Sequence, residues 1–249
     1  MVSAISPSVP AHQPRFSQTR WSIVLDLQQP GSDNAQRSLL DLCQRYWYPV
    51  YAYIRRCGHA ADIANDMTLG FFAQLKDVLQ QIDPRSQGRF RNFLLQQLHC
   101  FLTADWRRDP EAAYEQNLAP PFSVDELERR LQADHDRQAS PEQFFQRSFA
   151  LEVLSRSLRR LRSEAQQSGR LQMFDTLQPF LTREPVPGQY EELAQALKSQ
   201  PLVMAIAIKR LRQRFRELAD DELMETVASP NDLDAERNAL LAVLAKGAP

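Results

Sequence analysis

A cluster of basic residues lies in the last third of this 249-residue chain, and the chemistry it could perform is contact with phosphate. The segment 199–216 contains five basic residues and no acidic one, whereas 217–249 is clearly acidic. The five are Lys209, Arg210, Arg212, Arg214 and Arg216. The net charge of −1 therefore hides an uneven distribution, which is typical of a protein with one face directed at phosphate.

The surrounding residues predict a helix-turn-helix motif that would position this cluster. A short helix over 189–198 is followed by a brief turn and by a basic amphipathic helix from Pro201 to about Leu218. A basic run is often only a solvated face, but a short helix at this spacing before it favours contact with DNA. The basic residues are expected to be exposed, and the expected buried stripe is Val203, Ile206, Leu211 and Phe215.

Aromatic and basic residues also recur together from Tyr46 to Arg108. Two apolar-periodic runs in this stretch are separated by a Pro/Gly break at 83–88, which indicates a turn between two helices. We expect these helices to pack on one another. Their remaining aromatic and basic side chains form either core and solvated surface or a nucleic-acid surface.

Composition and turn signals predict an all-α chain with two helical domains. Only 7 glycines, with frequent Leu, Ala, Gln, Glu and Arg, favour helix throughout. Pro49 interrupts the first long periodic run and predicts a kink or a break next to Tyr48. The predicted parts are a disordered tail over 1–16, a helical domain over 17–108, a linker over 109–139, a helix-turn-helix domain over 140–219 and an acidic helical extension over 220–249.

The sequence gives no signal for an enzyme, a cofactor or a metal. Nothing resembles a nucleophile elbow, a P-loop or a paired-carboxylate site, and the histidines are scattered. Cys43, Cys57 and Cys100 lack metal-ligand spacing, so we expect them to be buried as small apolar residues. No signal-peptide core and no apolar run of membrane-spanning length occur, which predicts a cytoplasmic protein without membrane insertion.

Several stretches of the chain together resemble one bacterial family. RYWYPVYAYIRRCGH, the Asp66-Met67-Thr68 and Phe71-Phe72 that follow it, and GRFRNFLL resemble a domain that binds core RNA polymerase and melts promoters. YEELAQAL with AIAIKRLRQRFREL resembles the helix-turn-helix that reads the upstream promoter element. ELMETVASPNDLDAERNALLAVL resembles a C-terminal extension. The chain is thus similar to alternative sigma factors of the extracytoplasmic-function type, in the longer subgroup with that extension.

The resemblance implies a factor that binds core RNA polymerase and directs transcription initiation at particular promoters. Carboxylates would meet basic side chains of the polymerase clamp, and the implied residues are Asp62, Asn65, Asp66, Phe71 and Phe72. Unpaired promoter bases require stacking and a cationic groove, and the residues implied for this role are Arg89, Arg91, Asn92, Trp106, Arg107 and Arg108. In the helix-turn-helix, Gln200 would read bases and the basic cluster would contact phosphate.

Three departures from the family pattern affect these roles. The acidic clamp-binding stretch is here Ile63-Ala64-Asn65-Asp66, with two usually acidic positions apolar or neutral. Phosphorylation of Thr68 by a kinase would restore negative charge to this helix, whereas the alternative is that Thr68 packs or caps locally. The helix-turn-helix has Lys198 where the family usually has Gly, and Asp109-Pro110-Glu111 replaces a basic stretch.

These departures leave a second function open, a degenerate sigma-like protein that acts as a protein-binding adaptor with weak or no DNA binding. Under either function, an anti-sigma factor or a kinase would be a further partner of the protein. The acidic extension could also fold against the basic helix and mask it, because opposite charges are adjacent in the sequence. The alternative is that the extension only completes a domain core.

Overall fold

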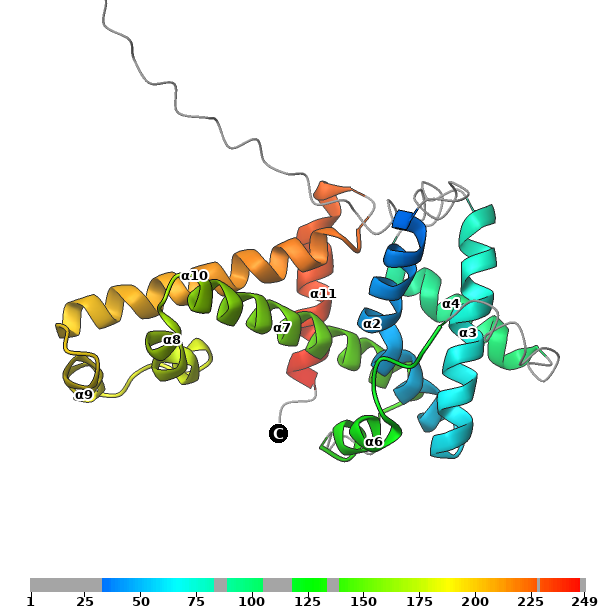
Figure 1. The fold of residues 1–249 in the computed structure, drawn as a ribbon, viewed down its shortest axis with the longest axis horizontal. Helices are drawn as coiled ribbons and strands as arrows, with labels where there is room; N and C mark the ends of the chain where they lie inside the picture. The colour runs from blue at the N-terminus through cyan, green and yellow to red at the C-terminus, as the bar shows by residue number, and fades with distance from the viewer. Residues whose placement is uncertain (1–32, 83–88, 105–117, 134–138, 228, 247–249) are drawn as a thin grey trace, which may run out of the picture.

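The computed structural model describes residues 33–82, 89–104, 118–133, 139–227 and 229–246, and within these residues it contains helices and no strands (Figure 1). The predicted all-α fold class is therefore confirmed for this part of the chain. A compact group of helices lies at one end, and a thin arm formed by α7, α8, α9 and α10 extends from it (Figure 1). The predicted tail over 1–16 lies outside the described residues.

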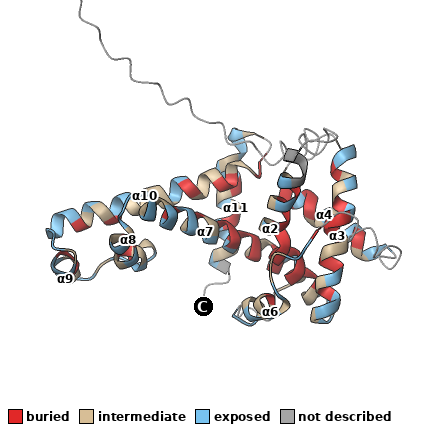
Figure 2. Ribbon diagram, viewed as in Figure 1, coloured by how far each residue is buried: buried red, intermediate tan, exposed pale blue. Residues whose placement is uncertain are grey.

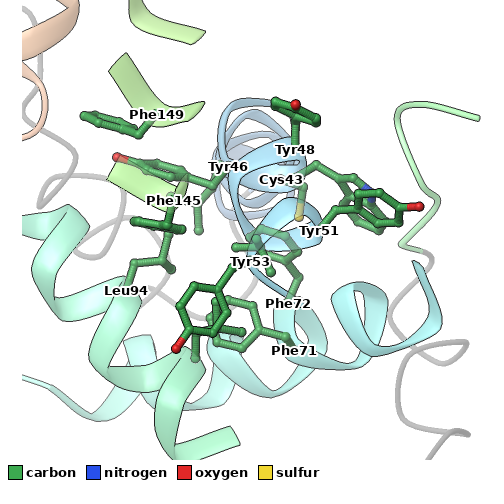
Figure 3. Close-up of a cluster of buried hydrophobic side chains, with 14 of the residues drawn as sticks. Cys43, Tyr46, Tyr48, Tyr51, Tyr53, Phe71, Phe72, Leu94, Phe145 and Phe149 are labelled. Atoms are coloured by element: carbon green, nitrogen blue, oxygen red, sulfur yellow. The ribbon is translucent and has the colours of Figure 1, made fainter. Parts of the chain in front are cut away.

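Helix α2 (Asp33–Arg56) is the centre of the compact group. All residues from 46 to 54 are buried, so this part of the helix is covered on every side rather than along one stripe (Figure 2). Helix α3 (Ala61–Gln81) and α4 (Phe90–Thr103) supply Phe71, Phe72 and Leu94 to the same core (Figure 3). Helix α2 continues through Pro49, so of the two predicted alternatives at this residue, a kink or a break, the break is wrong.

Helix α6 (Val124–Ala133) lies inside the segment predicted to be a linker, and it packs on the compact group. Leu127 is fully buried in the main core. Arg55 of α2 donates two hydrogen bonds to Glu128, at 2.7 and 2.9 Å, and these bonds lower the pKa of the Glu128 carboxyl. This part of the predicted linker is therefore a packed element of the fold.

Helix α7 (Pro141–Gln167) connects the compact group to the arm. It starts with a capping box in which Ser140 accepts a hydrogen bond from the Gln143 amide, and Pro141 occupies the first helical position. Its N-terminal half places Phe144, Phe145 and Phe149 in the main core, where Phe149 stacks on Tyr46 with ring centroids 5.5 Å apart (Figure 3). Its C-terminal half continues into the arm, where Leu161 packs with Phe174 and Leu218.

The arm contains the predicted helix-turn-helix segment. Helix α8 (Leu171–Leu177) runs into a 3-10 turn, η3 (Gln178–Leu181), and α9 (Gln189–Ala196) precedes the long helix α10 (Pro201–Met224). A small core joins these elements, with Leu177, Phe180, Leu193, Met204 and Ile208 buried against one another. The short helix, turn and basic helix thus occur in the predicted order.

The turn after α9 ends that helix with a Schellman motif. The Ser199 amide donates to the Ala194 carbonyl at 2.8 Å and the Lys198 amide donates to Gln195 at 3.2 Å. This motif requires a left-handed residue, and here it is Lys198 with φ of 49°. Glycine, which is usual at this position, would adopt that conformation without a Cβ penalty.

We expect Lys198→Gly to stabilise the protein by about 0.5–1 kcal/mol, because it removes the left-handed strain of a residue with a Cβ. Lys198→Ala removes the same charge but keeps the Cβ, so it is the matched control and should show no gain. Urea denaturation of the three proteins measures the difference. An equal gain from both variants would show that charge, not backbone conformation, decides the stability at this position.

The C-terminal extension returns to the compact group through η4 (Pro230–Asp232) and α11 (Leu233–Lys246). Leu223 and Leu240 belong to the main core, and the Phe90 amide at the start of α4 donates to the Thr226 carbonyl at 3.1 Å. Residues predicted to lie in three separate parts, before 109, after 139 and after 219, therefore share one core. The packing shows no break at the predicted boundary between 139 and 140.

Candidate nucleic-acid and polymerase interfaces

The predicted clamp-binding residues of α3 fall into an exposed pair and a buried pair. Asp62 and Asp66 are exposed and one helical turn apart, so their carboxylates lie on the same face. Asn65 is half-buried, and its Oδ1 atom has no hydrogen-bond partner within the described residues. Phe71 and Phe72 are 2% and 0% exposed and belong to the main core (Figure 3). The prediction that these two rings bind a partner is therefore wrong for this conformation, because they fill the interior.

Thr68 is also buried, with 0% of its surface exposed, and its hydroxyl donates to the Ala64 carbonyl at 2.7 Å. A kinase cannot reach this hydroxyl in the folded protein. The predicted phosphorylation of Thr68 is therefore wrong for this conformation, and the simpler alternative of local packing describes the residue. The physical reason is that Thr68 lies on the core-facing side of α3, next to Met67 and one turn from Phe71 and Phe72.

The predicted single-strand surface on α4 is largely occupied by another part of the chain. Arg91 is buried, and its guanidinium contacts the Glu236 carboxylate of α11 at 2.5 and 3.1 Å. Arg89 contacts the same carboxylate at 3.2 Å and stays partly exposed, while Asn92 is exposed. The prediction that Arg91 contacts DNA is wrong for this conformation, because its charge is neutralised inside the fold. Trp106, Arg107 and Arg108 lie outside the described residues.

Helix α10 presents one continuous exposed stripe, and it differs from the predicted one. Met204, Ile208 and Leu218 are buried, whereas Leu202, Val203 and Ile206 are 70%, 44% and 44% exposed. The prediction that Val203 and Ile206 are buried is therefore wrong. At steps of four and three residues the exposed stripe consists of Leu202, Ile206, Lys209, Gln213 and Arg216. Its first half is apolar and its second half is basic.

The five basic residues of α10 divide into two groups. Arg212 donates to the carbonyls of Phe180 and Arg183 and pairs with Glu184, which fixes α10 to the segment after η3. Arg214 donates to Glu164 of α7 at 2.7 and 2.9 Å, and these bonds raise the pKa of the Arg214 guanidinium. Both are committed to internal contacts.

The other three basic residues remain available at the surface. Lys209, Arg210 and Arg216 are exposed and have no acidic partner within the described part of the chain. Gln200 is exposed at the N-cap of α10, where its side chain makes no capping hydrogen bond. The possible phosphate and base contacts on α10 therefore reduce to these four residues.

The acidic segment meets basic residues mostly outside the five on α10 that it was expected to mask, with the one pair Glu217–Arg214 at 3.0 Å among the described residues of that group. Glu222 and Glu225 contact Arg45 of α2 at 2.9 and 2.7 Å, and Glu222 also contacts Arg160 of α7 at 3.0 Å. With the Glu236 pairs, this network ties the extension to the compact group and to α7. The sequence signal was the excess of acid after Leu218, but the partners are distant in the chain and could not be assigned from adjacency.

The cysteines are divided between core and surface. Cys43 is buried, and burial raises the pKa of its thiol to about 12. Cys57 and Cys100 are exposed, so the prediction that all three are buried is wrong. Among the described helices, none combines the length and the apolar character needed to cross a membrane.

A scan against protein-family models and searches of curated proteins and of solved structures each found no match for this chain.

Proposed function

We propose that this protein is a sigma-like initiation factor that binds core RNA polymerase through the exposed carboxylates of α3 and contacts promoter DNA through α10. The observation that carries the proposal is the short helix, Schellman turn and basic helix of the arm, with Lys209, Arg210 and Arg216 exposed and without an acidic partner among the described residues. The sequence resemblance to the extracytoplasmic-function family supports the same function. The protein supplies binding and positioning, and the polymerase performs the chemistry.

The physical basis of DNA binding would be counterion release. Each Lys or Arg that neutralises a phosphate contributes about one unit to the slope of log affinity against log salt. With three free cations on α10, we therefore expect a weak to moderate dependence of DNA affinity on salt. Arg91, Arg212 and Arg214 contribute little to it, because each is paired with an acid of the same chain.

The test is a fluorescence-anisotropy titration of duplex DNA over a range of salt concentrations. Replacing Lys209, Arg210 and Arg216 together by Ala should flatten the slope by about three units, because each of these side chains would neutralise one phosphate. Arg129→Ala, an exposed basic residue on α6, is the matched control and should leave the slope unchanged. A wild-type affinity that does not respond to salt would overturn the DNA-binding half of the proposal.

The polymerase half is tested separately by co-elution with bacterial core RNA polymerase on a sizing column. Asp62→Ala combined with Asp66→Ala should weaken co-elution, because it removes the exposed carboxylate pair of α3. Replacing Asp125 and Glu126 of α6 by Ala removes two acids elsewhere and is the control. Equal co-elution of the two double variants would exclude α3 as the binding surface.

One observation favours a second candidate, the protein-binding adaptor. The N-terminal part of α10, from which a helix-turn-helix reads bases, exposes Leu202, Val203 and Ile206 instead of hydrogen-bonding side chains. Exposed apolar groups close together are typical of a protein-binding surface. Co-elution with polymerase, together with DNA affinity that does not respond to salt, is the result that the adaptor predicts and the initiation factor does not.

A further inference from the structure

A groove lined mainly by apolar side chains lies between α7, α10 and α11, away from the turn of the helix-turn-helix segment. Its volume is about 800 Å³, within the range of about 300–1,000 Å³ that is usual for small-molecule sites. Figure 1 shows α7 and α10 running side by side with α11 crossing them, and these three helices form the floor and walls. The apolar lining includes Val153, Leu154, Phe215, Leu240, Leu241 and Leu244.

The charges at the groove are not balanced. Arg237 is neutralised by Asp220, with Nε and Oδ1 2.8 Å apart, and Glu217 is paired with Arg214 at 3.0 Å. Lys209 and Arg216 also line the groove, and no acid of the described residues pairs with either of them. Beside these paired charges, two cations without an acidic partner therefore remain at the groove, and they complement an anion.

The free cations and most of the leucines of the groove belong to different helices. The Arg237–Asp220 pair marks where α11 meets α10. A helix rises about 1.5 Å per residue, so Lys209 lies about 16 Å and Arg216 about 6 Å before that point along α10. Leu240, Leu241 and Leu244 are on α11, and Leu154 is on α7. The groove thus has its free cations on the α10 side and most of its leucines on the α7 and α11 sides.

We propose that this groove binds an anionic amphiphile of the long-chain carboxylate class. The carboxylate would contact Lys209 and Arg216, and the alkyl chain would lie against Leu154 and the leucines of α11. Burial of an alkyl chain contributes about 0.8 kcal/mol per CH₂, and a charge-assisted contact fixes its direction. The proposal does not rest on the proposed function, although Lys209 and Arg216 belong to both surfaces, and it is tested without DNA or polymerase.

The test compares two probes with the same alkyl chain and opposite head groups. Dodecanoate and dodecyltrimethylammonium are titrated separately into the full chain by isothermal calorimetry, each below its aggregation concentration. The groove should bind dodecanoate with saturable 1:1 stoichiometry and at least about tenfold more tightly than the cation, because only the anion matches Lys209 and Arg216. Equal affinity for the two probes would overturn the proposal.

Two substitutions locate the binding. Leu241 is 57% exposed and lines the groove, so Leu241→Glu places a carboxylate there and should weaken dodecanoate binding by about tenfold or more. Leu202→Glu introduces the same charge at an exposed leucine outside the groove and should leave binding unchanged. Lys209→Glu reverses an exposed charge on the α10 side and should weaken binding without changing an apolar lining residue. Unchanged binding in both Leu241→Glu and Lys209→Glu would show that dodecanoate binds elsewhere.

Discussion

Glu236→Gln is expected to destabilise the protein by about 3–5 kcal/mol, the usual result of removing one partner of a buried ion pair. Glu236 has no exposed surface, and its carboxylate contacts the guanidinium groups of both Arg91 and Arg89. The amide keeps the shape of the side chain but not its charge. Arg91 would then hold a buried charge without an acidic counterpart, and the extension would lose its main polar contact with α4. Urea denaturation followed by circular dichroism measures the loss.

Two controls separate this effect from a general response of α11. Asp234→Asn removes a carboxylate from the same first turn, but that side chain is 82% exposed, so the change should stay within about 0.5 kcal/mol. The double variant Arg91→Met, Glu236→Leu replaces the pair by apolar groups and should recover much of the stability. A loss below about 1 kcal/mol for Glu236→Gln would contradict the buried pairing, since exposed pairs have effects of that size.

Local sequence signals predicted the helices well, because the physics behind them is local. Ser140 followed by Pro141 is a local start signal of this kind, and α7 begins at Pro141. Pro201 similarly marks the first residue of α10. Pro49 does not break α2, because burial on every side of this helix outweighs the hydrogen bond that proline cannot make.

The candidate site was less predictable, because its character depends on contacts between distant parts of the chain. Arg91 and Glu236 are 145 positions apart, and nothing near either residue indicates the other.

On α10, Val203 and Met204 are adjacent apolar residues, and periodicity alone did not indicate that Met204 faces the core and Val203 the surface. The phosphorylation of Thr68 was suggested by the missing acidic residues of its helix. Its position on the core-facing side of α3 decides its role instead. For Lys209, Arg210 and Arg216, residue type alone was enough to predict that the side chain is exposed, and all three are exposed.

Phe149→Ala is expected to destabilise the compact group by about 3–5 kcal/mol, although this residue lies in the segment predicted to form the second domain. Phe149 is fully buried, and its ring is nearly parallel to that of Tyr46, at an interplanar angle of 4° (Figure 3). Truncation leaves a cavity beside α2 that the helix cannot close, because Phe145 and Phe90 already pack nearby. The unfolding free energy from urea titration gives the magnitude.

The region in which amide hydrogen exchange becomes faster distinguishes one shared core from two separate domains. If α7 belongs to the core of α2, Phe149→Ala should speed amide hydrogen exchange across residues 46–54, which are all buried. Phe174→Ala is the matched control, because that ring is equally buried but packs with Leu161 and Leu218 in the arm. It should speed exchange in α8 and the adjoining part of α10 and leave 46–54 protected. Faster exchange confined to 140–219 in both variants would instead support an independent second domain. A domain with its own core can lose stability without reducing the protection of α2 from exchange.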